Sequence, residues 1–181
     1  MDNVLISVIM SVYNEKIEWL QESIESILNQ TYKNIEFIII LDNPDNKELD
    51  WIIKMYSSAN SRIKYFSNSK NEGIVYSLNY AIKESNGQII ARMDADDIAL
   101  PNRLEVQLKD MKKNHYDIVG SGAIYIDENG KVQGYSTTYG QDYNSCIESL
   151  KLRSILIHPT WMIKKSVFET VGYYHDVPAA E

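Results

Sequence analysis

Hydrophobic residues in the first hundred positions follow two alternating spacings. Nearly continuous apolar runs occupy residues 4–10, 35–41, 63–66 and 88–93, and such runs are typical of strands buried on both faces of a sheet. Between these runs, apolar residues recur every three or four positions, which predicts helices over 17–28, 49–56 and 74–82 and a fourth helix opened by Pro101. Repeated strand–helix units predict an α/β fold with a mostly parallel sheet and helices on both faces.

The second half of the chain is less regular. We expect short extended segments at 118–119, 124–126 and 160–163, a turn at 127–130, and helices near 142–152 and 165–171. Asn86 and Gly87 are interpreted as the end of the third helix, and Gly172 as the end of the last one. A single domain with a small irregular or antiparallel second half follows from this pattern.

Composition and charge narrow the function classes. The 181 residues are 44% apolar with a formal net charge of −7, which suits a soluble globular protein and disfavours nucleic-acid binding. The single cysteine, Cys146, excludes a disulfide framework and a cysteine-based zinc site. No segment approaches the roughly 20 apolar residues that cross a bilayer, and residues 4–10 lack the features of a signal peptide. We therefore expect a cytoplasmic protein.

Polar residues follow three of the predicted strands where each strand ends. They are residues 11–15 after the first strand, 42–45 after the second and 94–97 after the fourth. Because ligands bind at the carboxyl ends of strands in an open α/β sheet, these residues are expected to share one site. There, Tyr13 could stack on a planar base and Asp42 could accept a hydrogen bond from a nucleobase.

The strongest chemical feature is the acidic cluster of Asp94, Asp96 and Asp97. Three carboxylates within four residues repel one another, and a divalent ion that prefers oxygen ligands, Mn²⁺ or Mg²⁺, relieves that repulsion. Such an ion usually takes one or two protein carboxylates and completes its shell with water and phosphate oxygens, which matches a nucleoside diphosphate. The alternative is a solvated acidic loop that caps the helix near Pro101.

Alternatives stay open for three other candidates. Asp42 equally fits a turn or a helix cap before residues 45–46. The backbone N–H groups of residues 71–73 could face an anion or simply cap the third helix. His158 could touch a sugar or diphosphate, or it could be a hydrogen-bonded histidine before the turn at Pro159.

Six segments, in order, resemble the family 2 glycosyltransferases of GT-A fold. They are VIMSVYNE (8–15), SILNQTY (26–32), NEG (71–73), DADD (94–97), HPT (158–160) and KSVFETVG (165–172). The resemblance runs over nearly the whole chain and is far more specific than a lone Asp-x-Asp motif. It implies a GT-A, Rossmann-like fold in which 1–100 form the nucleotide-binding half and 101–181 begin an acceptor-side half.

The same resemblance implies an inverting transferase that moves a sugar from a nucleotide-sugar, most often a UDP-sugar, to a hydroxyl of a saccharide or lipid-linked acceptor. Tyr13 would stack on the uracil and Asp42 would bind its polar edge. Asp96 would be the principal ligand of Mn²⁺ or Mg²⁺, supported by Asp97, so that the metal stabilises the diphosphate leaving group. The other donor-binding residues would be Val12, Glu15, Asn71, Gly73, Asp94 and Ala95.

The sequence departs from the family pattern in two places. Ser11 stands where many relatives have proline, and LDNP at 41–44 replaces DDGS, which leaves one carboxylate rather than two beside the base. The general base that deprotonates the acceptor is expected in a Glu-Asp pair, of which Glu181, the last residue, would be the first member.

We therefore expect a truncated protein, with any contact to the inner membrane face lying in the missing part. The alternative to an active enzyme is a module that binds the donor without turnover. A sugar-nucleotide pyrophosphorylase is disfavoured, because residues 12–15 lack a glycine-rich, arginine-bearing loop.

Overall fold

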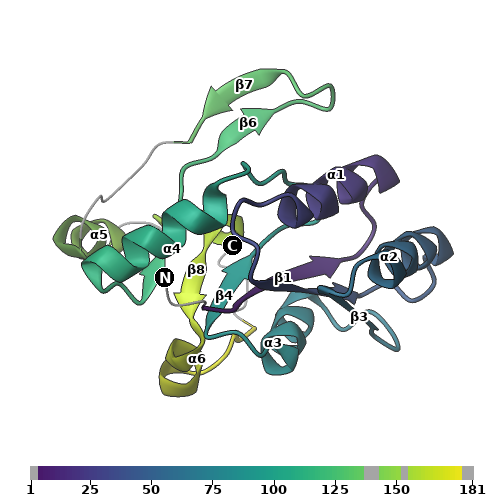
Figure 1. The fold of residues 1–181 in the computed structure, drawn as a ribbon, viewed down its shortest axis with the longest axis horizontal. Coiled ribbons are helices and arrows are strands. Elements are labelled where there is room, and N and C mark those ends of the chain that lie inside the picture. Colours follow the sequence, from purple (N-terminus) through teal and green to yellow (C-terminus); the bar gives the residue numbers. More distant parts are fainter. Residues whose placement is uncertain (1–3, 137–142, 152–154, 177–181) are drawn as a thin grey trace.

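The computed structural model describes residues 4–136, 143–151 and 155–176. A six-stranded sheet of order β3-β2-β1-β4-β8-β5 forms its centre (Figure 1). Four of its strands are parallel: β1 (Ile6–Val12), β2 (Ile35–Leu41), β3 (Ile63–Ser67) and β4 (Ile89–Arg92). Two short strands extend the sheet, where β8 (Met162–Lys164) runs antiparallel to both β4 and β5 (Ile118–Val119). The predicted α/β fold with a mostly parallel sheet is confirmed.

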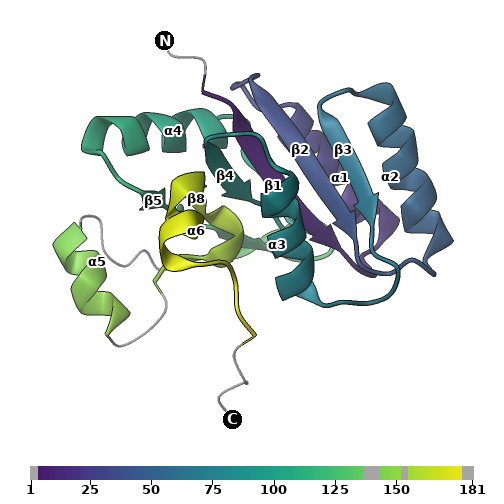
Figure 2. The ribbon, with the colours of Figure 1, turned by 90° about the horizontal axis from the view of Figure 1, so that it is seen from below.

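Helices cover both faces of this sheet. The helices α1 (Ile17–Leu28), α2 (Lys47–Ala59) and α4 (Arg103–Asn114) pack on one face. On the other face lie α3 (Ile74–Glu84) and α6 (Lys165–Val171), which stand in front of the sheet in Figure 2. Alternate strand residues serve the two layers, since Val8 and Met10 pack toward the first group and Ile9 toward the second. Both layers thus fix the position of the sheet edge at which the polar residues gather.

The second half adds smaller elements. A hairpin of β6 (Ile124–Ile126) and β7 (Val132–Tyr135) forms a separate antiparallel sheet that projects from the body in Figure 1. The helix α5 (Tyr143–Leu150) and the 3-10 turn η1 (His158–Thr160) precede β8. In the part of the chain that the structure describes, no helix has both the length and the apolar character needed to span a membrane.

Three predicted boundaries were wrong, each for a local reason. The first strand continues to Val12, because β1 pairs with β2 along its whole length. Pro101 does not open α4, which begins at Arg103, because the Pro101 carbonyl instead accepts a hydrogen bond from the Thr31 N–H at 2.8 Å. The third helix ends at Glu84, three residues before Gly87, whose role is packing against β1.

His115 ends α4 in a strained backbone conformation. Its φ of 56° lies in the left-handed region, and it is the non-glycine residue with positive φ among the described residues. Because glycine adopts this conformation without a Cβ clash, His115→Gly is expected to raise the free energy of unfolding by about 1 kcal/mol. Urea denaturation of the two proteins measures the difference, and an unchanged or lowered midpoint would contradict the expectation.

Candidate functional site

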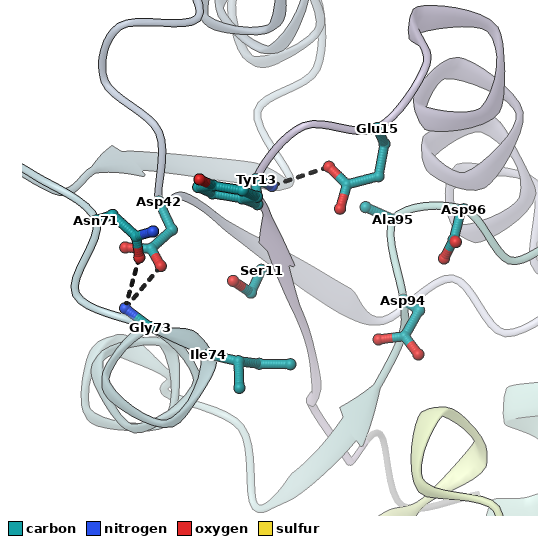
Figure 3. Close-up of a pocket in the computed structure, with 10 residues that line it drawn as sticks. All are labelled: Ser11, Tyr13, Glu15, Asp42, Asn71, Gly73, Ile74, Asp94, Ala95 and Asp96. Carbon is teal, nitrogen blue, oxygen red and sulfur yellow. Dashed lines mark hydrogen bonds between the residues drawn. The ribbon is translucent and has the colours of Figure 1, made fainter.

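One pocket of about 300 Å³ opens at the carboxyl ends of β1, β2 and β4. In Figure 3 the groups from β2 and the start of α3 form one side, the acidic loop after β4 forms the other, and the Tyr13 ring lies between them. The lining residues are Ser11, Tyr13, Glu15, Asp42, Asn71, Gly73, Ile74, Asp94, Ala95 and Asp96. The structure therefore brings together every predicted donor-binding residue except Val12, together with Asp96.

The loop after β1 supplies the aromatic wall of the pocket. The ring of Tyr13 is 49% exposed, and its backbone N–H donates to Glu15 Oε2 at 2.9 Å, which ties the two residues together. Val12 is different, because its side chain is fully buried in the core beneath. Its carbonyl accepts the Asp42 N–H at 2.7 Å, so Val12 shapes the pocket through the backbone.

Asp42 is a buried carboxylate that accepts three hydrogen bonds from the protein. Its Oδ1 accepts from Asn68 Nδ2 at 2.6 Å and from the Glu72 N–H at 2.9 Å, and its Oδ2 accepts from the Gly73 N–H at 2.8 Å. Asp42 therefore caps the N-terminus of α3 rather than α2, which is capped by Asn46. The N–H groups of residues 72–73 do face an anion, and that anion is Asp42 itself.

Polar side chains on α1 and just after its end hold the acidic loop in place. Ser23 Oγ donates to the Asp94 carbonyl at 2.9 Å, and Ser26 Oγ accepts the Ala99 N–H at 3.0 Å. Gln30, fully buried, donates to the Leu100 carbonyl at 2.8 Å and accepts the N–H of Leu104 in α4 at 3.1 Å. The segment 26–32 thus has a structural role. It fixes the loop that carries the carboxylates, and it caps the N-terminus of α4.

Two arginines balance part of the charge of this loop. Arg92 Nη2 forms an ion pair of 2.7 Å with Asp94 Oδ1, and Arg103 Nη2 donates to the Arg92 carbonyl at 2.7 Å. Burial lowers the pKa of Arg103 to about 10. Burial of its carboxyl group and the charges of Asp94 and Asp96 still raise the pKa of Asp97, against the opposite effect of the arginines. The loop therefore keeps an excess of negative charge.

The remaining candidates for metal and base chemistry are placed as follows. Asp96 is exposed and lines the pocket, and it has no ion-pair partner among the described residues. Asp97 does not line the pocket. Within the described ranges, no three His, Cys, Asp or Glu residues are arranged to hold a metal ion. A cation at this edge would take most of its ligands from a bound molecule and water. Glu181 lies outside the described residues.

Comparison with known proteins identifies the family of the chain. The sequence profile described as glycosyl transferase family 2 matches residues 7–172. The chain belongs to this family. The family profile covers all the elements that build the pocket, from β1 to the loop after β4.

Named relatives agree with this assignment. An uncharacterized glycosyltransferase of Methanocaldococcus jannaschii is 41% identical over 174 residues, which are 96% of this chain and 60% of that protein. The O-antigen biosynthesis glycosyltransferase WbnJ of Escherichia coli is 37% identical over 163 residues, which are 90% of this chain and 63% of that protein. The chain thus spans about three fifths of the length of these relatives.

Solved glycosyltransferases share the fold at lower identity. S. aureus TarS, residues 1–349, has a TM-score of 0.74 at 20% identity, over 97% of this chain and 52% of that one. A mannosyltransferase from Pyrobaculum calidifontis, solved with GDP-Man and Mn2+, has a TM-score of 0.70 at 17% identity, over 94% of this chain and 47% of that one. These likenesses confirm the predicted GT-A fold.

In this family 2 protein, His158 is not one of the residues that line the pocket. Its Nε2 is 2.9 Å from the Tyr174 hydroxyl, which is the hydrogen-bonded arrangement that the sequence left as one alternative. Burial, and then the charge of Arg92, lower the pKa of His158 to about 4, although Asp94 acts in the opposite direction. The imidazole is therefore neutral at pH 7.

The low pKa of His158 predicts a loss of stability in mild acid. An unfolded histidine takes up a proton below about pH 6.5, whereas folded His158 does so only near pH 4, so protons favour the unfolded chain in this window. Lowering the pH from 6.5 to 4.5 should reduce the free energy of unfolding through this residue by about 2 kcal/mol. His158→Gln should flatten this slope in urea titrations at several pH values, whereas His115→Asn, at an exposed histidine, should retain it.

Three residues important to the geometry were not assigned to the site from the sequence. Ser11 was noted only as a departure from the family pattern, and it lines the pocket. Ile74 belongs to the apolar stripe of α3, but it is the first residue of that helix and is 52% exposed in the pocket. Arg92 was part of an apolar strand run, and the only signal was a charged residue at the end of a buried strand.

Proposed function

We propose that the chain binds a nucleotide-sugar, most readily a UDP-sugar, as donor for the inverting transfer of the sugar to a hydroxyl acceptor. One observation carries this proposal: an aromatic ring, a buried carboxylate and an acidic loop meet in one pocket of a family 2 glycosyltransferase chain. S. aureus TarS, which shares the fold, has been solved with UDP-GlcNAc. In the proposal, residues 1–100 hold the donor and residues from 101 onward begin the acceptor side.

The base would lie between Tyr13 and Asp42. Three hydrogen bonds already reach the Asp42 carboxylate, two on Oδ1 and one on Oδ2, and each oxygen has two lone pairs. One acceptor position therefore remains, on Oδ2. Uracil presents a single ring N–H, whereas guanine presents a ring N–H beside an amino group and would need two acceptors. This count favours uracil over guanine as the base.

The diphosphate would lie at the opposite side of the pocket, near the acidic loop. The charge of Asp94 is balanced by Arg92, which leaves the Asp96 carboxylate available to a cation. A Mn²⁺ or Mg²⁺ ion held by Asp96, with Asp97 in support, would act as a Lewis acid on the leaving group. Glu15, Asn71, Gly73 and Ala95 would complete the donor site. The mannosyltransferase of the same fold was solved in complex with GDP-Man and Mn2+.

A donor-binding module without turnover is the second candidate. It is favoured because the residues of the described pocket lining are assigned to the donor or the metal, and none of them is assigned as the general base. In both candidates the acceptor is a saccharide or lipid-linked hydroxyl, and the site acts in the cytoplasm, at the inner face of the membrane. Binding and turnover assays on the same protein separate the two.

Thermal unfolding with UDP and Mn²⁺ tests the donor site. At about a hundredfold excess over Kd, binding adds about 2.7 kcal/mol to stability, which for a chain of this size raises Tm by about 5–10 °C. We expect Asp96→Ala to abolish the Mn²⁺-dependent part of this shift, because it removes the carboxylate available to the ion. Asp110→Ala, at an exposed aspartate of α4, should leave the shift unchanged.

Two results would count against the proposal. An unchanged melting curve of the wild-type protein at saturating UDP and Mn²⁺ would remove the donor site altogether. An equal shift in the wild-type protein and Asp96→Ala would leave nucleotide binding intact but contradict the metal assignment. Binding without release of sugar from UDP-sugars, with or without acceptors, would favour the binding module over the enzyme.

A further inference from the structure

Arg92 is a buried cation at the end of β4 and forms an ion pair with Asp94 of the pocket lining. The residue is 4% exposed. Its backbone is held on both sides, because its N–H donates to the Trp161 carbonyl at 2.8 Å and its carbonyl accepts from Arg103 Nη2 at 2.7 Å. The guanidinium is therefore projected from a rigid point of the sheet and has little freedom to move.

Among the described residues, the guanidinium has one direct partner. Nη2 lies 2.7 Å from Asp94 Oδ1, whereas Nε and Nη1 are buried without a hydrogen-bond partner among the described residues. The charge of Arg92 acts to lower the pKa values of His158 and Tyr174. These two residues are hydrogen-bonded to each other and are neutral at pH 7. A buried cation that depends on one carboxylate holds that carboxylate strongly, because either charge alone would be costly in this environment.

Asp94 is correspondingly fixed from two directions. Its carbonyl accepts from Ser23 Oγ at 2.9 Å, and its Oδ1 is held by Arg92. The side chain remains 35% exposed and lines the pocket, and its Oδ2 has no partner among the described residues. Figure 3 shows this carboxylate directed toward the pocket interior, opposite the Asp42 side. The arrangement leaves one oriented acceptor oxygen facing the pocket.

We infer that Arg92 is a positioning residue for donor binding: it fixes the Asp94 carboxylate so that Oδ2 accepts a hydrogen bond from a hydroxyl of the nucleotide-sugar. The inference rests on the proposed function. Arg92 does not line the pocket, so its effect on the donor passes through Asp94. A merely structural role in the core would instead change stability without a specific link to Asp94.

A double-mutant cycle on the full chain distinguishes these roles. Calorimetry measures the Kd of UDP-GlcNAc with Mn²⁺ for the wild-type protein, Arg92→Met, Asp94→Asn and the double variant. We expect each single change to weaken binding about tenfold, and the double variant to bind no more weakly than Asp94→Asn, since both changes remove the same interaction. Arg92→Lys keeps a charge that can reach Asp94, so it should restore part of the affinity lost in Arg92→Met.

Each outcome has a defined meaning. If the losses of affinity in the two single variants multiply, to about a hundredfold in the double variant, the inference is overturned. Wild-type affinity in Arg92→Met would also overturn it. If Arg92→Met does not fold, the cycle is run with Arg92→Lys, where the same non-additivity with Asp94→Asn is expected and multiplication overturns the inference. If the wild-type protein binds neither UDP nor UDP-GlcNAc in titrations run before the cycle, the proposed function itself is contradicted, and this failure is distinct from every outcome of the cycle.

Discussion

Asp42→Asn is expected to destabilise the protein by about 3 kcal/mol and to weaken UDP binding at least about tenfold. The carboxylate is 3% exposed and accepts hydrogen bonds from the backbone N–H groups of Glu72 and Gly73 and from Asn68. An amide of the same shape has one acceptor oxygen and places an NH₂ group against one of these donors. It also removes the negative charge that stabilises the N-terminus of α3.

Urea denaturation and UDP calorimetry measure the two effects separately. Asp45→Asn is the matched control, because it makes the same chemical change in the same loop at an exposed residue. The control should change the unfolding free energy by less than about 0.5 kcal/mol. If Asp42→Asn retained wild-type stability, the cap on α3 would not depend on the charge. If stability fell but the Kd for UDP did not change, the assignment of Asp42 to the base would be lost.

The convergence of the site was predictable from the sequence, because it depends on strand order in the chain and not on detailed packing. Once β1, β2 and β4 are parallel neighbours, the residues after them share one edge, which places Tyr13, Asp42 and Asp94 around one pocket. Periodicity sufficed for this, since the apolar runs are long and the helix stripes regular. The roles of these residues in donor binding remain predictions.

The partners of the site residues were not predictable in the same way. Asp42 accepts an N–H group from a residue thirty positions later, and Gln30, just after α1, is joined to Leu104 in α4. Neither contact has a local sequence signature. Arg92 shows the same limit. The repulsion within the acidic loop suggested a metal ion, but a buried arginine behind the sheet edge balances one of the three carboxylates. Long-range partners of this kind come from tertiary packing, which periodicity does not describe.

The structural role of Gly87 differs from the role that the sequence predicts. The sequence suggested a helix end, whereas the structure places Gly87 against β1, where its N–H donates to Ser7 Oγ at 2.8 Å and to Glu36 Oε1 at 3.2 Å. Glu36 is 7% exposed. Burial alone would raise the pKa of Glu36, but hydrogen bonds from Lys64, Ser7 and the Asn86 backbone outweigh it and lower that pKa. Gly87 is therefore part of a satisfied buried network.

Gly87→Ala should consequently destabilise the protein by about 3 kcal/mol or more. A Cβ at this position would lie 2.6 Å from Ser7 Oγ, 2.7 Å from the Leu5 carbonyl oxygen and 2.8 Å from the Ser7 nitrogen. The Leu5 oxygen and the Ser7 nitrogen are backbone atoms at the start of β1 and just before it. Removing the clash therefore requires displacing a central strand and breaking the hydrogen bonds to Glu36. The φ of Gly87 is not positive, so the expected effect isolates close packing from backbone strain.

Gly134→Ala provides the matched control in the β6–β7 hairpin. The nearest atom to its added Cβ is Tyr125 Cδ2 at 3.8 Å, an ordinary contact, so the free energy of unfolding should change by less than about 0.5 kcal/mol. Urea denaturation of both variants at pH 7 gives the comparison. A loss below about 1 kcal/mol for Gly87→Ala would mean that the start of β1 yields to the methyl group. That result is incompatible with a strand held by the β2 ladder on one side, by the β4 ladder on the other and by the Glu36 network.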